Sequence, residues 1–522
     1  YVLTWDMVFG PSHVFPALSG FLNALPLTLL IYGAGFIIPM WVVQKLILIG
    51  LFFSLFYLPL RFFPFKVDAW AKYAGATFYA VNPFVYERFL AGQWGVLATY
   101  ALLAPFLYFL LEIIHAPRVR TALYLALTML LVGVFSLHAF VMAILVAVAV
   151  IAVTILRDVR GGVALAKYAS LAGGIVGIVS LYWLVPYLLN PETAPLPNFT
   201  EAHWSAFQTS VDRIVFGNAT GNVLMLYGFW GESYPWMQSL FSPKDSLLLF
   251  LPALLALSIV IIVGGVGLTR ERDSRSRALL IVTIGIAAFI FSVGIAPSIF
   301  HSFNTWLFER VLFWPGFRDT EKWSMWLALT YAYFFAAGAS YVVHAVRPKL
   351  KYTAQCALIL LPLVYTFTML GGFAGQIRAV DYPASWYKVN VILAKDPECK
   401  ALFLPWHQYY WLTFNNNILT GNTASRFFDC EIVSSADAEI GEIGEQGNSD
   451  PSYRSIAEVV TNNAQDLDAA IAVLRREGIK YVILTNDVQK YGLFRYSFLA
   501  HPQFERIYER TVDNQSVALL KL

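Results

Sequence analysis

Apolar residues run along this chain in long blocks, and short polar loops separate the blocks. A membrane-spanning helix needs about 20 mostly apolar residues. An additional apolar stretch, 20–38, is interrupted by one proline and two glycines. Ten other stretches approach the required length, and we predict that they cross a membrane: 42–60, 68–83, 94–114, 121–137, 139–156, 168–189, 246–268, 279–297, 324–346 and 353–373.

The pattern changes near residue 376, where apolar blocks become shorter and charged residues more frequent. This change predicts a small α/β domain after the membrane helices. A segment rich in Asp, Glu, Gly and Ser, 436–452, predicts a solvated loop within it. The predicted elements are strands at 401–404, 480–485 and 516–522 and an amphipathic helix at 466–478.

The chain therefore divides into three predicted parts. Residues 1–41 form a first exterior loop and a juxtamembrane helix. Residues 42–375 form an α-helical polytopic membrane domain of about ten spans, with long exterior loops at 190–245 and 298–323. Residues 376–522 form the C-terminal exterior α/β domain.

Composition supports a multi-pass protein of the cell membrane. Hydrophobic residues make up 58% of the 522 residues, charged residues make up 13%, and the mean hydropathy is +0.60. Soluble domains carry about 25% charged residues, so this composition excludes an ordinary water-soluble enzyme and a disordered chain. A net charge of +3 provides no basic surface for a nucleic acid, which excludes a nucleic-acid-binding protein.

Basic residues distinguish the two sides of the predicted membrane domain. Short cytoplasmic loops of membrane proteins carry an excess of Lys and Arg. We place the richer set of alternating loops in the cytoplasm and the poorer set, together with the C-terminal domain, outside. The richer loops hold Arg61, Lys66, Lys72, Arg118, Arg120, Arg157, Arg160, Lys167, Arg270, Arg272, Arg275, Arg277, Arg347, Lys349 and Lys351. The poorer loops hold Arg88, Arg213, Lys244, Arg310, Arg318 and Lys322.

Two further features agree with that orientation. The Asn-x-Ser/Thr sequons at Asn198, Asn218 and Asn514 all fall in segments placed outside, where glycosylation occurs. Cys399 and Cys430 both lie in the exterior domain, where an oxidising compartment allows a disulfide between them. The sequence does not give their separation, so the bond is a prediction.

The predicted spans contain no Asp, Glu, Lys or Arg near their midpoints. Pumps and ion-coupled transporters need such groups at depth, so a solute or lipid transporter would lack its polar path here. Polar residues gather instead in exterior segments, and we expect the functional site at the outer membrane face, beneath the C-terminal domain. The polar clusters are 4–13, 82–94, 198–236 and 317–323.

Three segments carry a family resemblance: NPFVYERFLAGQWGVLATYALLAPFLYFLL from Asn82, FRDTEKW from Phe317 and LPWHQYY from Leu404. They resemble the C-type (GT-C) membrane glycosyltransferase superfamily, near the prokaryotic arabinofuranosyltransferases of cell-wall assembly and related archaeal multi-pass proteins. The resemblance extends over most of residues 1–410. In that superfamily the donor is a sugar on a polyprenyl phosphate, and an acidic residue in the first exterior loop serves as catalytic base or metal ligand.

Only Asp6 matches the position of that acidic residue. The chain lacks the WWDYG-like motif of oligosaccharyltransferase catalytic subunits. It also lacks a paired Asp-x-Asp, which leaves open whether a divalent cation, Mg or Mn, takes part. Glu201 and Glu232 are the acids that can join Asp6 in such a site, although nothing in their spacing requires it.

The resemblance also bears on the topology of the first segment. If Asp6 lies outside, the stretch 20–38 lies along the membrane surface as a juxtamembrane helix, and a first span upstream of Tyr1 brings the chain out. If 20–38 crosses the membrane instead, Asp6 is cytoplasmic and the catalytic assignment fails.

Charge suggests a role for each candidate residue. Glycosyl transfer from a lipid phosphate needs a base for the proton of the acceptor hydroxyl, and cations for the leaving phosphate. Asp6 is the candidate base. Arg318 and Lys322, spaced i and i+4 on one predicted helix face, are candidates for binding the donor phosphate, and Arg88 can add a bidentate contact. The candidate acceptor or sugar surface is the aromatic group at 406–411, chiefly Trp406, His407 and Tyr410.

Each of these candidates has a purely structural alternative. Asp6 can cap a helix or pair with a lysine, and Arg88 can form an ion pair with Glu87. Arg318 and Lys322 can anchor to lipid headgroups without specificity. Aromatic residues near span ends usually belong to the interfacial belt. His13 and His203 are interpreted as structural residues rather than metal ligands.

The leading functional hypothesis is a membrane glycosyltransferase. It would move a sugar from a polyprenyl-phosphate donor to a glycan or lipid-linked acceptor on the outer face, among the membrane lipids. The alternative is a non-catalytic membrane scaffold or partner-docking subunit. Lipid reaching from Arg318 and Lys322 toward Asp6 would favour the enzyme, and a gap filled by side chains would favour the scaffold.

Overall fold

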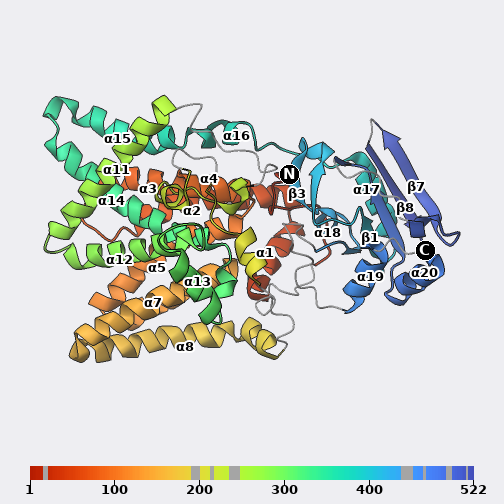
Figure 1. The fold of residues 1–522 in the computed structure, drawn as a ribbon, viewed down its shortest axis with the longest axis horizontal. Helices are drawn as coiled ribbons and strands as arrows, with labels where there is room; N and C mark the ends of the chain where they lie inside the picture. Colours follow the sequence, from red (N-terminus) through yellow and green to blue (C-terminus); the bar gives the residue numbers. More distant parts are fainter. Residues whose placement is uncertain are drawn as a thin grey trace.

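The computed structural model describes residues 1–15, 22–189, 200–211, 217–233, 247–436, 451–461, 466–489, 497–512 and 515–522. A bundle of long helices forms one part of the molecule, and a domain of strands and short helices adjoins one end of the bundle (Figure 1). The N-terminus lies where the two parts meet, and the C-terminus lies at the far side of the strand domain.

Each of the ten predicted apolar stretches coincides with a helix of the bundle. Their apolar side chains are buried where helices face one another and exposed on the outer surface, as expected of helices surrounded by lipid. The helices are α2 (Met40–Arg61), α3 (Ala69–Ala80), α5 (Trp94–His115), α6 (Val119–Phe135), α7 (Leu137–Arg157), α8 (Val159–Leu189), α11 (Leu247–Arg270), α12 (Arg275–Val293), α14 (Ser324–Ala345) and α15 (Lys351–Tyr365).

The number of helices that can span a membrane alone is smaller than ten. Among the described residues, seven helices are long and apolar enough, or eight if one bent pair is a single span. The predicted span 68–83 is α3, which has 12 residues and is about 18 Å long, too short for a hydrocarbon core of about 30 Å. α6 has 17 residues and is also short of the usual length.

The predicted span 353–373 is broken. α15 ends at Tyr365, and the following helical segment, Phe367–Ala374, is inclined to it by 74°. Gly371 and Gly372 have φ values of +63° and +69°, a left-handed conformation that glycine adopts without a steric penalty. These two glycines explain why the apolar run does not continue as one helix.

α14 is the central helix of the bundle. It packs against α3, α11 and α12, and 83% of its spanning window is buried. Small residues allow close backbone contact with α11: a Cβ added to Gly338 would lie 1.8 Å from the carbonyl oxygen of Val260, and one added to Gly264 would lie 1.9 Å from that of Phe334.

The apolar stretch 20–38 contains η1 (Leu22–Ala24) and α1 (Leu25–Gly35). The 11 residues of α1 extend about 16 Å, which suits a helix lying along a membrane surface better than one crossing it. The Asn23 side chain donates to the carbonyl of Gly133 at the end of α6 (2.8 Å), and Tyr32 accepts a hydrogen bond from Arg426 of the strand domain (2.8 Å). α1 therefore lies between the bundle and the strand domain.

Residues after 376 form two sheets. One has five strands in the order β4-β1-β5-β8-β7, with β4, β1 and β5 parallel and β8 and β7 antiparallel to their neighbours. The other is antiparallel, in the order β3-β2-β6. The strands are β1 (Lys400–Leu404), β2 (Tyr409–Leu412), β3 (Ile418–Gly421), β4 (Glu431–Val433), β5 (Tyr481–Thr485), β6 (Val488–Gln489), β7 (Glu505–Val512) and β8 (Gln515–Lys521).

Alternating side chains of β1 enter two separate cores, as the period of two requires. Ala401 and Phe403 pack on the side of α17 (Ala384–Leu393), while Leu402 and Leu404 pack on the side of α19 (Pro451–Thr461) and α20 (Leu467–Arg476). Three predicted strands and the predicted helix at 466–478 are therefore present. Most of the predicted loop 436–452 falls outside the described residues.

A disulfide joins Cys399 and Cys430, with an S–S distance of 1.99 Å. The two residues precede the parallel strands β1 and β4, whose backbone pairing brings them together. Cys356, on α15, is a free cysteine.

Shorter helices occur between the long helices in the sequence and within the strand domain. They include α4, η6 and η7, which contribute to the site described below. Their bounds are α4 (Pro83–Leu90), α9 (Glu201–Ala206), α10 (Ala219–Leu224), η4 (Trp230–Ser233), α13 (His301–Arg310), η6 (Trp314–Phe317), η7 (Thr320–Trp323), η8 (Pro348–Leu350), α18 (Ala424–Phe427), η10 (Thr413–Asn415) and η11 (Ser497–Ala500).

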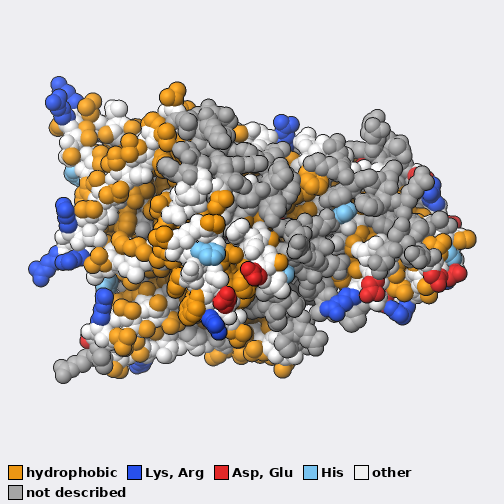
Figure 2. Space-filling model, in the orientation of Figure 1, with side chains coloured by type: hydrophobic (Ala, Val, Ile, Leu, Met, Phe, Trp, Pro, Cys, Tyr) orange, Lys and Arg blue, Asp and Glu red, His pale blue; other side chains and the backbone are white. Residues whose placement is uncertain are grey.

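Basic side chains gather at the end of the bundle that is remote from the strand domain (Figure 2). Helices α2, α7 and α11 each end in an arginine: Arg61, Arg157 and Arg270. The asymmetry of basic residues seen in the sequence thus corresponds to the two ends of the molecule.

Candidate functional site

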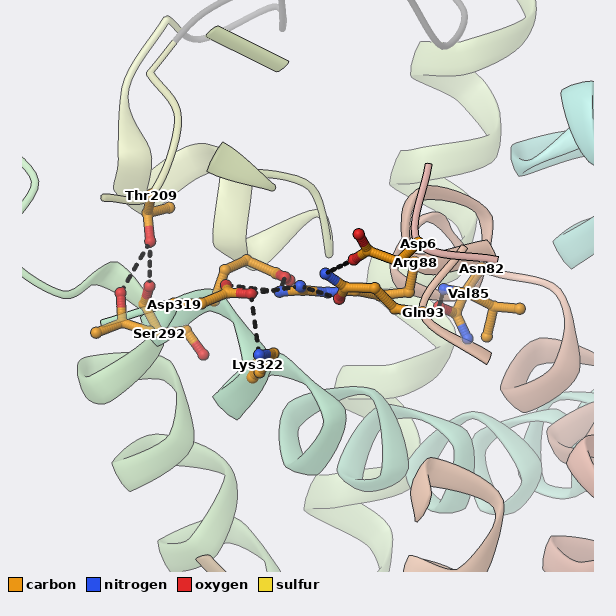
Figure 3. Close-up of polar contacts among 11 residues, drawn as sticks. Asp6, Asn82, Val85, Arg88, Gln93, Thr209, Ser292, Asp319 and Lys322 are labelled. Atoms are coloured by element: carbon orange, nitrogen blue, oxygen red, sulfur yellow. Dashed lines mark hydrogen bonds and ion pairs between the residues drawn. The ribbon is translucent and has the colours of Figure 1, made fainter. Parts of the chain in front are cut away.

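A cluster of charged side chains lies at the end of the bundle that faces the strand domain. The N-terminal segment 1–15, the α4–α5 junction and the turn between η6 and α14 contribute to it (Figure 3). Asn82 starts α4: its side-chain oxygen accepts from the backbone N–H of Val85 (3.1 Å), and Pro83 occupies the first helical position.

Arg88 is the centre of the cluster. Its side chain has no exposed surface, and its two terminal nitrogens donate to both carboxylate oxygens of Asp319, at 2.6 and 2.9 Å. The same guanidinium donates to Glu321 and to the side-chain oxygen of Gln93, the latter at 2.7 Å. A buried arginine needs such partners because an unpaired buried charge is costly.

This environment does not favour the predicted role of Arg88 in binding the donor phosphate, and that role stays a prediction. The guanidinium is buried, and its terminal nitrogens already contact two carboxylates. The alternative of an ion pair with the adjacent Glu87 is wrong in its partner, because Asp319 and Glu321 are the acids that pair with Arg88. Glu87 instead lies against Glu232; burial, followed by this second carboxyl group, raises its pKa well above the ordinary value.

Asp6 is the accessible acid of the cluster. Gln93 donates to one of its carboxylate oxygens (3.3 Å), and the hydroxyl of Tyr409 donates to the other (2.9 Å). Gln93 also contacts Arg88, so a continuous row of polar contacts leads from Asp6 through Gln93, Arg88 and Asp319 to Lys322 (Figure 3).

The surroundings of Asp6 and Asp319 shift the pKa values of these two carboxyl groups in opposite directions. The side chain of Asp6 is exposed but has protein on most sides, and this partial desolvation raises its pKa, although hydrogen bonds from Tyr409 and Gln93 counteract the effect. Burial would also raise the pKa of Asp319, but Arg88 and Lys322 outweigh burial and hold it below the ordinary value. A carboxylate with a raised pKa accepts a proton more readily than one held by cations.

Lys322 and Arg318 lie on the same side of the cluster. The ammonium of Lys322 is 3.4 Å from a carboxylate oxygen of Asp319, and 12% of its side chain is exposed. The guanidinium of Arg318 lies over the ring of Phe207, 4.9 Å from its centre. Both cations lie near enough to His138, at the start of α7, to interact electrostatically with its ring. Arg318 and Lys322 are therefore close to each other.

The predicted helix face shared by Arg318 and Lys322 is not present. η6 ends at Phe317 and η7 begins at Thr320. Between them Asp319 has φ −85° and ψ 76°, which are not helical values. The two cations are brought together by this turn and not by i, i+4 spacing on one helix.

Two of the three residues of the predicted sugar surface at 406–411 expose little surface, and the role of this group stays a prediction. Trp406 and Tyr410 are buried, with 7% and 1% of their surface exposed, and Tyr410 donates to the carbonyl of Pro405. His407 is half-buried and lies edge-on to Tyr410. The neighbouring Tyr409, on the opposite face of β2, is the residue that reaches the site.

The described residues contain no group of three or more His, Cys, Asp or Glu side chains placed to hold a metal ion. Glu232 lies against Glu87, Glu201 is exposed in the first turn of α9, and His203 forms a capping box with Thr200. His13 stacks on Phe36, with ring centres 5.3 Å apart. The involvement of Mg or Mn stays a prediction.

Of the three sequons, only Asn218 is described. It is exposed and caps α10, where its side-chain oxygen accepts from the backbone N–H of Gly221 (2.7 Å). Asn198 and Asn514 lie outside the described residues. Glycosylation of all three stays a prediction.

Comparisons with known proteins bear on the fold. The chain is similar to the cryo-EM structure of the arabinofuranosyltransferase AftD from Mycobacteria, with a TM-score of 0.63, 14% identity and 100% of this chain covered. A mutant structure of the same enzyme gives a TM-score of 0.60 with 15% identity over 94% of this chain. The resemblance to C-type glycosyltransferases is confirmed at the level of the fold.

That similarity is partial in length. This chain spans 38% and 36% of the two AftD chains. No protein-family model matches the sequence, and no curated protein matches it either.

Proposed function

We propose that the chain is a membrane glycosyltransferase that moves a sugar from a polyprenyl-phosphate donor to a glycan or lipid-linked acceptor. The observation that supports this most is the row of side chains from Asp6 to Lys322. It combines an accessible carboxylate with a raised pKa and two cations at one end of an apolar bundle. The AftD-like fold supports the same reaction class.

Each residue has a role in the proposed reaction. The acceptor hydroxyl attacks the anomeric carbon of the sugar, and its proton passes to Asp6. The bond from that carbon to the phosphate oxygen breaks, and the electron pair stays on the phosphate. Lys322 and Arg318 stabilise the charge on the departing phosphate. A single displacement inverts the configuration at the anomeric carbon.

The site belongs, in this proposal, to the outer face of the cell membrane. The basic end of the bundle would face the cytoplasm, and the strand domain and the N-terminus lie at the opposite end. This orientation also places the Cys399–Cys430 disulfide in an oxidising compartment. The enzyme named in the comparison transfers arabinofuranose, so an arabinofuranosyl donor is the first to test.

Asp6→Asn is the direct test of the reaction. In liposomes supplied with farnesyl-phosphate-linked arabinofuranose and arabinan oligosaccharides as acceptors, we expect transfer to fall by about 10²- to 10⁴-fold because the proton acceptor is lost. Radiolabelled product measures the rate. Asp381→Asn, which changes an exposed aspartate of the strand domain, is the matched control and should transfer at the rate of the unmodified protein.

If Asp6→Asn transfers as fast as the control, Asp6 is not the base and the enzymatic proposal loses its central residue. Absence of transfer by the unmodified protein itself would favour the non-catalytic scaffold. Thermal unfolding of both variants in detergent shows whether a loss of transfer comes from the site or from the fold.

A further inference from the structure

The segment that carries Asp6 depends on its surroundings for its shape. Residues 1–15 contain one isolated bridge and no helix or longer strand. The strand domain holds this segment at several points along its length. Donor–acceptor contacts run from the Tyr1 amine to Val380 O (2.8 Å), from Asn415 Nδ2 to Leu3 O (3.2 Å), from Gly421 N to Trp5 O (2.7 Å) and from Tyr382 Oη to Phe9 O (2.6 Å).

The bundle holds the same segment from the other side. The backbone N–H of Asp6 donates to the carbonyl of Ala91 (2.9 Å). A Cβ added to Gly92 would lie 2.6 Å from the backbone nitrogen of Asp6, and one added to Gly421 would lie 3.1 Å from the carbonyl oxygen of Trp5. The chain around Asp6 is therefore enclosed between the two parts of the molecule.

Each carboxylate oxygen of Asp6 accepts a hydrogen bond from a different part of the molecule. Tyr409, on strand β2, donates to Oδ1 at 2.9 Å, and Gln93, at the start of α5, donates to Oδ2 at 3.3 Å. One donor belongs to the strand domain and the other to the bundle. Trp5 packs beside Tyr409, with ring centres 6.1 Å apart. Together the two donors fix the plane of the carboxylate.

We infer that Tyr409 is a positioning residue for Asp6: its hydroxyl orients the carboxylate, so the strand domain takes part in building the membrane site. The consequence for sugar transfer rests on the proposed function, but the contact itself does not. No motif in the sequence points to Tyr409 rather than to its aromatic neighbours.

The effect on the pKa of Asp6 of removing the Tyr409 hydrogen bond depends on the other charged and polar groups around the carboxylate. Lys322 favours the ionised carboxylate and Asp319 opposes it, and the hydrogen bonds from Tyr409 and Gln93 both favour it. Tyr409→Phe removes one of these donors and leaves the others in place. The ionised form then loses a charge-assisted hydrogen bond, and the pKa of Asp6 rises further.

Chemical labelling of Asp6 tests the inference without a substrate. A water-soluble carbodiimide with an amine nucleophile modifies protonated carboxyl groups, and peptide mass spectrometry of the purified full chain in detergent follows Asp6 across pH. We expect Tyr409→Phe to move the midpoint of labelling upward by about one pH unit. Tyr481→Phe, which removes a tyrosine–aspartate contact to Asp396 in the same domain, should leave the midpoint unchanged.

Transfer measurements supply the second readout. With the donor and acceptor named above, the acidic limb of the rate profile should shift upward with Tyr409→Phe, while the rate above that limb stays within a few-fold of the unmodified protein. An unchanged labelling midpoint with an intact fold would overturn the positioning role. If labelling shifts but the unmodified protein transfers no sugar, the proposed function fails and the inference about Tyr409 survives. If labelling shifts and Asp6→Asn still transfers sugar, only the role of Asp6 as base fails.

Discussion

Arg88 shows how a residue that resembles a ligand-binding group can hold a site together instead. Its guanidinium has no exposed surface and balances the buried carboxylates of Asp319 and Glu321. Replacing a buried ion pair by apolar groups can be neutral, but removing one partner leaves uncompensated charge. The arginine therefore stabilises the turn from which Lys322 extends.

Arg88→Met should destabilise the protein by about 3–5 kcal/mol because two buried carboxylates lose their cation. Adding Asp319→Asn and Glu321→Gln to that variant should recover part of the loss, since the stranded charges are removed. Thermal unfolding in detergent measures both effects. Arg120→Met, on the exposed surface of α6, is the control, and an Arg88→Met variant as stable as this control would contradict the assignment.

The sequence identified Asp6, Arg318 and Lys322 through the resemblance and through charge, and the structure brings them into one region. It could not show that Arg88 is buried, because the two carboxylates that pair with it are more than 200 positions away. It also could not separate Tyr409 from Tyr410. Adjacent strand residues face opposite sides, and the register of β2 depends on pairing with β3 and β6.

At the scale of elements, the contact between α11 and α14 is a close helix pairing that glycine makes possible. Gly264 and Gly338 face the partner backbone with no room for a side chain. Contacts through small residues are a common way for helices to associate in membranes, where lipid is as apolar as the helix surfaces.

Gly338→Ala should therefore force the two helices apart or bend them. We expect a loss of about 1–3 kcal/mol, the usual cost of overpacking, measured as a lower unfolding temperature. Gly173→Ala on α8 is the matched control, because a Cβ there meets nothing within 4 Å; it should be neutral or slightly stabilising. Equal stability of the two variants would show that α11 and α14 do not pack as described.

Apolar blocks predicted the positions of ten helices because burial in lipid requires a long, continuous run. They did not predict that α3 is short or that the last run bends after Tyr365. They also did not single out α14 as the central helix. Those properties depend on which helix contacts which, and a local pattern of apolar residues does not specify contacts between distant segments.

At the scale of the whole molecule, the boundary near residue 376 and three strands of the five-stranded sheet followed from the sequence. The second sheet, β3-β2-β6, did not, because its strands are short and β6 pairs with β2 from a distant part of the sequence. Nothing in the sequence pattern predicted that residues 1–15 form hydrogen bonds with the strand domain. The candidate site thus requires both the helix bundle and the strand domain. The pattern of apolar and polar residues in either part alone does not reveal this requirement.

The most direct test of the account is a cryo-EM structure of the full chain in lipid nanodiscs with a non-cleavable farnesyl phosphonate analogue of the arabinofuranosyl donor. We expect the phosphonate to contact Lys322 and Arg318 and the anomeric carbon to face the carboxylate of Asp6. Analogue bound elsewhere, or at the cations with its sugar turned away from Asp6, would contradict the claim that this carboxylate and these cations serve one sugar phosphate.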